Sequence, residues 1–225
     1  MTRYIRLSYP ITKDMPLYPG LEPVVLEPKR SIAGGDTSNS FRFTMSNHAG
    51  THVDAPRHFA GKGRAISEYG MDELIFSKPL VLDCPKQPGQ RIDARDIEKA
   101  LPGDCDILLI RTHFSRWRVA GKTRYAEENP FLDPSAAKLI REGFAAIKAI
   151  GIDTISIASA TDRERGRESH RILLKDDSFG TGPVLIVEDM MIPEGLSRLK
   201  SVIVLPVMVE GLDSAPCAVL GVIDD

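Results

Sequence analysis

One short segment concentrates the residues of this chain that could bind a metal or move a proton. Residues 48–58 read HAGTHVDAPRH and hold three of the five histidines together with Asp54. Imidazole and carboxylate groups without thiolates suit Zn²⁺, Mn²⁺, Fe²⁺ or Ni²⁺. His58 could be a further ligand or a proton carrier, because imidazole titrates near neutral pH. The segment predicts the metal site of a hydrolase, and a chance cluster of solvated side chains is the alternative.

The spacing of His48 and His52 limits the backbone that could bring both rings to one ion. A helix would place them on one face, as in the zinc-binding HExxH helix, but Gly50 and Pro56 disfavour a helix. On a straight strand the two residues would lie about 13 Å apart, at roughly 3.3 Å per residue. We therefore expect the chain to bend at Ala49 and Gly50, since glycine tolerates a tight turn.

The preceding residues, 40–47, alternate between polar and apolar side chains. This period of two is typical of a half-buried strand. We expect its apolar members, Phe41, Phe43 and Met45, to face the core. The candidate ligands would then continue the polar side, away from the core.

A catalytic metal site needs ligands from elsewhere in the chain and an open position for water. His170 follows the charged stretch 161–168, which we expect to be an exposed loop. Glu188 ends the apolar run 184–187, so its carboxylate would emerge at the rim of a buried strand. Both are candidates, whereas His113 could line the pocket or lie on the surface.

Strand-like and helix-like segments alternate along the chain and predict a single α/β domain over residues 1–225. The expected strands are residues 79–83, 106–112, 153–158, 184–188 and 201–205. The longest expected helix begins at Asp133-Pro134 and stops at Gly151, because aspartate, proline and glycine are typical at these positions.

Composition excludes several classes of protein. The net charge is −2 with neutral histidines, and no basic run favours a nucleic-acid or anionic-membrane partner. No apolar signal-peptide core or membrane-length apolar run is evident, so we expect a cytoplasmic protein. The cysteines, Cys84, Cys105 and Cys217, are odd in number and widely spaced, which indicates neither a disulfide framework nor a cysteine zinc site.

The segment 48–58 is similar to the HxGTHxDxPxH signature of the cyclase-like metal-dependent hydrolase family, which includes bacterial kynurenine formamidases (arylformamidases) and isatin hydrolases. The resemblance covers nearly the whole chain. It extends to residues 7–20, 109–112, 151–156, 170–174, 186–189 and 211–217.

The resemblance implies a role for each candidate ligand. His48 and His52 match histidines that bind one metal, and Asp54 matches an aspartate that bridges two. His170 matches a ligand of the second metal, and Glu188 matches a glutamate that bridges both. One or two divalent ions per subunit are implied, with Zn²⁺ expected first and Mn²⁺ as the alternative.

The resemblance also implies a catalytic and a substrate-binding residue. His58 matches the family's proton donor and acceptor. Tyr18 stands where the formamidases carry a tryptophan that helps hold the aryl substrate. The loop 176–182 lengthens the interval between His170 and Glu188, so formyl-kynurenine is not singled out as the substrate. The implied fold is the swivelling β/β/α type with a mixed sheet or barrel-like core, in homodimers or homotetramers.

These observations lead to one main hypothesis and two alternatives. The main hypothesis is a metal-dependent, arylformamidase-like hydrolase of a small-molecule, non-peptide C–N amide, either an N-formyl aryl amide or a cyclic amide. His58 would pass a proton to the leaving nitrogen. The alternatives are a hydrolase of lactones or esters and a non-catalytic binding module that the metal stabilises.

Overall fold

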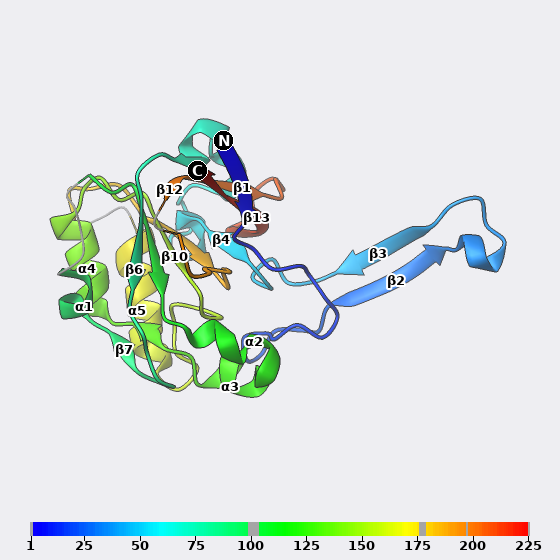
Figure 1. Cartoon of the computed structure of the whole chain (residues 1–225), viewed down its shortest axis with the longest axis horizontal. Helices are drawn as coiled ribbons and strands as arrows, with labels where there is room; N and C mark the ends of the chain where they lie inside the picture. The colour runs from blue at the N-terminus through cyan, green and yellow to red at the C-terminus, as the bar shows by residue number, and fades with distance from the viewer. Residues whose placement is uncertain (1, 99–103, 176–178, 197, 225) are drawn as a thin grey trace.

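The computed structural model describes residues 2–98, 104–175, 179–196 and 198–224, and shows an α/β body from which a long two-stranded ribbon extends (Figure 1). The chain ends lie close together because β1 pairs with the last strand, β13. Within the described residues, no helix combines the length and the apolar character needed to cross a bilayer.

A mixed sheet forms the body, and it comprises nine strands in the part of the chain that the structure describes. The strands run in the order β5 (Ile75–Phe76), β12 (Leu199–Pro206), β13 (Ser214–Asp224), β4 (His52–Asp54), β11 (Leu185–Glu188), β10 (Ala149–Ile152), β8 (Ile107–Arg111) and β6 (Pro79–Asp83), with β1 (Thr2–Arg6) beside β13. Strands β6, β8, β10 and β11 are parallel, and the other pairs are antiparallel. Contacts between β12 and β6 bring the sheet close to a barrel, which confirms the predicted mixed, barrel-like α/β core.

Of the helices in the described part of the chain, the first and the last two cover one face of this sheet. The helices are α1 (Ala94–Glu98), α2 (Trp117–Ala120), α3 (Lys122–Glu127), α4 (Pro134–Gly143) and α5 (Arg163–Leu174). Of these, α4 packs on α1 and α5, and α5 contacts β11 (Figure 1). Short paired segments, β7 (Arg91–Ile92) and β9 (Phe131–Leu132), lie beside this helical layer.

The apolar run of β8 is continuous because both faces of this strand are buried. Leu108 and Ile110 belong to the core between the sheet and the helices, whereas Ile107 and Leu109 belong to the core inside the barrel. A strand that is buried on both faces gains from an apolar side chain at every position. The strands predicted at 79–83, 106–112, 184–188 and 201–205 are confirmed.

The prediction that Phe41 and Phe43 face the core is wrong. They lie on β3 (Ser40–Thr44), which pairs only with β2 (Val25–Arg30) among the described strands, in the ribbon outside the body (Figure 1). Their side chains are 65% and 62% exposed. The strand itself is present, but alternation cannot tell which surface a strand will pack against.

The helix after Asp133 is shorter than predicted. Asp133 caps it as expected, because its side chain accepts a hydrogen bond from the Ser135 backbone N–H, but α4 ends at Gly143. Gly151, predicted as the stop, lies inside β10. A Cβ at Gly151 would lie 2.7 Å from Leu109 and would overlap Met190. This glycine is therefore required for strand packing rather than for ending a helix.

Two further local predictions are wrong. Residues 153–158 form an irregular segment after β10 instead of a strand. Residues 163–168, predicted as part of a loop, form the first turns of α5. The Asp162 side chain caps that helix by accepting from the Arg165 N–H. Of the predicted loop 176–182, residues 176–178 lie outside the described residues.

Candidate metal centre

Strands β4 and β11 bring three of the candidate residues onto one face of the sheet. Glu188 stands directly opposite His52 in the antiparallel register, and Asp54 follows two residues along β4. Val53, between them, points into the barrel core. Alternation along a strand therefore puts His52 and Asp54 on the helical side of the sheet, where Glu188 is their cross-strand neighbour.

A turn before β4 brings His48 back to this face. Gly50 has a φ of +73°, in the left-handed region that favours glycine. The bend predicted at this position is confirmed. It sets the His48 and His52 rings 5.3 Å apart between centroids and places His48 Nδ1 3.1 Å from Asp54 Oδ1.

Helix α5 brings His170 over the same face. The helix can approach closely at Gly166, where a Cβ would lie only 2.5 Å from the Ala158 Cβ. His170 Nε2 then lies 3.4 Å from Glu188 Oε1 and 3.7 Å from Asp54 Oδ2. Residues more than a hundred positions apart in the sequence thus meet around Asp54.

Backbone carbonyls fix the orientation of two of the imidazole rings. His52 Nδ1 lies 2.8 Å from the Gly50 carbonyl oxygen, and His170 Nδ1 lies 2.8 Å from the Gly166 carbonyl oxygen. Because a carbonyl oxygen only accepts hydrogen bonds, each Nδ1 carries the proton. The Nε2 atom of each ring is left to face the carboxylates, which is the arrangement of metal-binding histidines.

The buried polar atoms at the centre fit a cation. His52 Nε2 and both carboxylate oxygens of Asp54 are buried and accept or donate no hydrogen bond within the described structure. Leaving such atoms unsatisfied costs about 1–3 kcal/mol each, and more for charged groups. Three nitrogens and two carboxylates converge here, a donor set suited to Zn²⁺ or Mn²⁺.

The pKa values of the histidines and carboxylates in this cluster also indicate that it favours a positive charge. Burial lowers the pKa of His52 and of His170, but Asp54 and Glu188 outweigh burial and raise both above the ordinary histidine value. Burial raises the pKa of Asp54, but His52 and His48 outweigh it and hold that pKa below its usual range. The cluster therefore attracts positive charge, which a metal ion can also supply.

The irregular segment after β10 donates hydrogen bonds to the Glu188 carboxylate. Its Oε1 accepts hydrogen bonds from the Ser156 hydroxyl at 2.9 Å and from the Ile157 N–H at 2.7 Å. The next residue, Asp189, adopts a φ of +51° and forms a buried two-bond ion pair with Arg118. These contacts fix the end of β11 and the direction of the Glu188 carboxylate.

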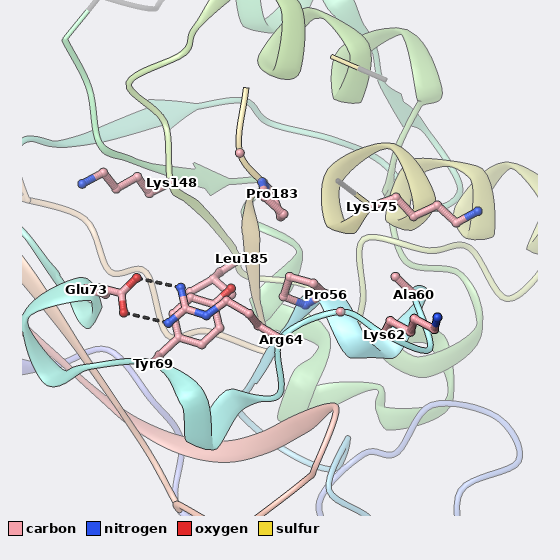
Figure 2. A pocket seen from close by; sticks show the side chains of 12 residues that line it. Pro56, Ala60, Lys62, Arg64, Tyr69, Glu73, Lys148, Lys175, Pro183 and Leu185 are labelled. Carbon is pink, nitrogen blue, oxygen red and sulfur yellow. Dashed lines mark hydrogen bonds and ion pairs between the residues drawn. The ribbon is translucent and has the colours of Figure 1, made fainter. Parts of the chain in front are cut away.

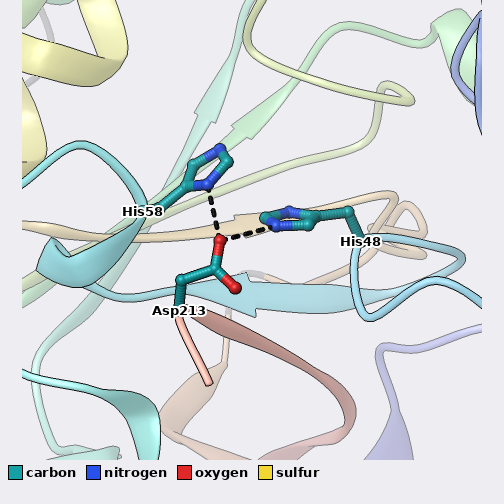
Figure 3. Close-up of side chains that lie close together, drawn as sticks. All are labelled: His48, His58 and Asp213. Carbon is teal, nitrogen blue, oxygen red and sulfur yellow. Dashed lines mark hydrogen bonds and ion pairs between the residues drawn. The ribbon is translucent and has the colours of Figure 1, made fainter. Parts of the chain in front are cut away.

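Asp213, which the sequence-based reasoning did not select, completes the cluster (Figure 3). Its Oδ2 accepts from His58 Nδ1 at 2.8 Å and from His48 Nε2 at 3.0 Å. Its Oδ1 accepts from the Asn47 side-chain amide at 2.8 Å. Burial lowers the pKa of His48, but the carboxylates of Asp213 and Asp54 outweigh burial and raise it to about 10. Asp213 thus orients two of the predicted site residues.

His58 lies at the edge of this cluster rather than at its centre. It sits on the 3₁₀ turn η2 (Pro56–His58), and Asp213 accepts its Nδ1 proton, so Nε2 stays free (Figure 3). Among the described residues, three overlapping groups have ligand atoms close enough together for one ion: His48, His52 and Asp54; Asp54, His58 and His170; and His48, His58 and Asp213.

The cluster forms the floor of a cavity of about 300 Å³. Tyr18 lies on its wall, as expected for a substrate-binding residue, and its hydroxyl donates to the Ser159 carbonyl oxygen. His113 does not line this cavity; it borders a separate hollow and pairs with Asp83 at 2.7 Å. The cavity is lined by Tyr18, Pro19, Leu21, His48, His52, Asp54, His58, Phe59, Ile155, Ser156, Ala158, Arg163, Arg167, His170 and Glu188.

A larger cavity, of about 570 Å³, is lined by Pro56 of η2 (Figure 2). Pro56, Tyr69 and Leu185 form part of its apolar lining. Lys148 and Lys175 lie at opposite sides of it in Figure 2, with their ammonium groups pointing apart. Its lining contains no histidine or cysteine, whereas each of the possible metal-binding groups found among the described residues includes side chains that line the smaller cavity.

Comparisons with known proteins identify the family of this chain. The family model described as "Putative cyclase" matches residues 5–159. A kynurenine formamidase of Bacillus thuringiensis is 26% identical over 217 residues, which cover 96% of this chain and 95% of that protein.

Solved structures share the fold. Isatin hydrolase A from Labrenzia aggregata superposes with a TM-score of 0.81 at 19% identity, covering 100% of this chain and 94% of that one. A Bacillus stearothermophilus protein described as a predicted metal-dependent hydrolase superposes with a TM-score of 0.73 at 25% identity, covering 99% and 98%. Since the family model spans residues 5–159 of 225, this chain belongs to the putative cyclase family.

Proposed function

We propose that this protein is a metal-dependent hydrolase of a C–N bond in a small, non-peptide amide, either an N-formyl aryl amide or a cyclic amide. The observation that carries the proposal is the buried, unsatisfied cluster around Asp54 on the floor of an open cavity. The similarity to a kynurenine formamidase and the shared fold with an isatin hydrolase support this choice of bond.

The residues that would hold the ions are His48, His52, Asp54, His170 and Glu188. Zn²⁺ is the ion we propose first, with Mn²⁺ as the alternative, because both accept imidazole and carboxylate ligands. A bound divalent ion would supply Lewis-acid polarisation of the substrate carbonyl and would make water acidic enough to react near neutral pH.

His58 would move the proton that the reaction requires. The Asp213 carboxylate accepts the Nδ1 proton of His58, so Nε2 can take a proton and return it to the leaving nitrogen. Asp213 keeps the ring in this tautomer and orientation, as carboxylates do for catalytic imidazoles in other enzymes. The apolar side chains of Phe59 and Ile155 would hold the organic part of the substrate beside these groups.

The test is hydrolysis of N-formylkynurenine, formanilide and isatin by protein reconstituted with Zn²⁺ or Mn²⁺, with metal content measured in parallel. We expect turnover of at least one amide that chelation abolishes and metal restores. In this assay His58→Ala should keep its metal while kcat falls about 10²–10⁴-fold, the range for loss of a general acid–base group. Hydrolysis of simple lactones but of none of the amides would contradict the proposed bond specificity.

We also propose that the protein works as a homodimer or homotetramer. The ribbon of β2 and β3 leaves the body and exposes Phe41, Phe43 and Val25. A two-stranded ribbon is marginal by itself, and exposed apolar clusters mark interaction sites. Light scattering after size-exclusion chromatography should give a mass of two or more chains, and Phe41→Ser with Phe43→Ser should lower it. A monomer for the wild-type protein would exclude the proposal.

A further inference from the structure

One face of α5 carries more than a metal-ligand candidate. Arg163, Arg167 and His170 follow one another at spacings of four and three, which places them on the same side of a helix. All three line the cavity above the Asp54 cluster. At a rise of about 1.5 Å per residue, Arg167 lies roughly one turn and Arg163 roughly two turns from His170 along the helix.

These two arginines are weakly neutralised. Arg163 forms no hydrogen bond or ion pair with any residue that the structure describes. Arg167 approaches the Glu164 carboxylate at 4.0 Å, and both side chains are more than half exposed. An exposed ion pair at that distance contributes little, so the guanidinium groups of Arg163 and Arg167 both remain available to a ligand.

The other arginines of α5 are engaged within the protein. Arg165 pairs with Asp133 at 2.9 Å. Arg171 pairs with Glu164 at 3.1 Å and with Glu168 at 3.3 Å. Neither lines the cavity. The cations of this helix that lack a close partner are therefore the two that face the cavity.

The remaining lining divides the cavity into two ends. The floor is formed by the residues proposed to hold the metal, so the scissile amide would lie there. The walls are apolar, and Phe59 stacks on His170 with ring centroids 5.1 Å apart. A ligand that fills the space would place a ring or chain against these walls and any negative charge at the arginine end.

We propose that Arg163 and Arg167 bind a carboxylate of the substrate, so that the enzyme prefers amides that carry a carboxylate remote from the scissile C–N bond. This inference rests on the proposed function for the reaction but not for the binding. Guanidinium groups suit the task because they present paired N–H donors to both carboxylate oxygens.

The kinetic test compares two substrates with the same scissile bond, formanilide and 4-formamidobenzoate. The wild-type, metal-loaded enzyme should show the lower KM for 4-formamidobenzoate. The double variant Arg163→Gln, Arg167→Gln should raise the KM for 4-formamidobenzoate about tenfold and leave kcat unchanged. The lost hydrogen bonds to the carboxylate would stabilise the bound substrate and the transition state equally, so their loss weakens binding without slowing the chemical step. The parameters of the double variant for formanilide should stay within about twofold of wild type.

The control is Arg171→Gln, which removes one arginine charge from the same helix outside the cavity. It should leave the KM for both substrates unchanged within about twofold, because distant exposed charges are screened. An effect of Arg171→Gln as large as that of the double variant would show that only net charge matters and would overturn the inference.

A binding measurement separates the inference from the proposed reaction. Phenylurea and 4-ureidobenzoate resemble the two substrates but resist hydrolysis, and each can be titrated into metal-loaded protein by calorimetry. Tighter binding of 4-ureidobenzoate, lost in the double variant, supports the carboxylate site even if neither formamide is hydrolysed. Equal binding of the two ureas by the wild-type protein overturns the inference, even if both formamides are hydrolysed.

Discussion

The turn Pro56–His58 contributes to two cavities, Pro56 to the larger and His58 to the smaller, and both contain charged side chains. In the smaller one, Asp54 is 1% exposed and both of its carboxylate oxygens lack a hydrogen-bond partner among the described residues. In the larger one, Glu73 is an exposed acid that forms two 2.8 Å hydrogen bonds with Arg64. Both residues are acids, but only Asp54 is buried without a hydrogen bond, with the imidazole nitrogen His48 Nδ1 3.1 Å from its Oδ1.

The difference shows which property identifies a functional site in this molecule. A solvated ion pair is balanced by its partner and by water, so it needs no ligand. A buried carboxylate without a hydrogen bond carries a desolvation cost, which neutral imidazoles beside it do not offset. A stable protein can keep such a buried carboxylate when a bound cation balances its charge. Cavity volume and the presence of charged residues alone would therefore point to the larger cavity, which is the wrong one.

The strongest challenge to this comparison is Asp54→Asn, which keeps the shape of the side chain and removes its charge. We expect metal affinity to fall more than about 100-fold, beyond the usual cost of losing an outer-shell partner, and amide hydrolysis to disappear. Equilibrium dialysis followed by elemental analysis measures the first effect. Full metal content in this variant would show that the buried cluster is not the metal centre.

An intermediate effect is expected for Asp213→Asn. The residue contacts His48 and His58 but is not a proposed ligand, so the metal should remain while kcat falls about 10–100-fold. The asparagine amide can reproduce the shape but not the charge that stabilises a protonated imidazole. If this variant also loses its metal, Asp213 is itself a metal ligand, in the group formed with His48 and His58.

The smallest effect is expected for Glu73→Gln in the larger cavity. The Arg64 guanidinium lowers the pKa of Glu73 to about 2 from its ordinary 4.5, so the ion pair stabilises the fold above pH 4.5 and is lost as the pH falls towards 2. Because both side chains are about half exposed, the loss at pH 7 should be only about 0.5 kcal/mol.

Urea unfolding of the wild-type and Glu73→Gln proteins at pH 7 and pH 3 measures this difference. It should shrink at the lower pH, and hydrolytic activity at pH 7 should be unchanged. A loss of activity with Glu73→Gln would show that the larger cavity contributes to the reaction.

The sequence was sufficient for the part of the site that lies in one segment. Residue types around Asp54 indicated the metal chemistry, and Gly50 indicated the bend, because both depend on local properties of the chain. Asp213 was missed because a single aspartate before a strand carries no spacing signal. Its importance arises only when β13 pairs with β4 and places it beside His48 and His58.

The wrong predictions have a common cause, which is that composition was interpreted without tertiary context. The charged stretch 161–168 suggested a loop, yet Asp162 supplies a helix cap and the spacing of Arg163, Arg167 and His170 matches one helix face. Phe41 and Phe43 alternate as core residues would, but their strand lies outside the body. Periodicity describes which side chains share a face, and the fold determines what that face meets.

The position of β4 has a consequence for the order of folding. This strand of three residues, His52–Asp54, is hydrogen-bonded on one side to β11 and on the other to β13, both of which are synthesised more than a hundred residues later. Pairings so distant in sequence require closure of long loops and form slowly. The segment that carries most of the metal-site residues therefore has no neighbouring strand until β11 has emerged, and its second neighbour is the last strand, β13. We infer that the site is assembled at the end of folding, as a late product of the whole chain rather than a nucleus for it.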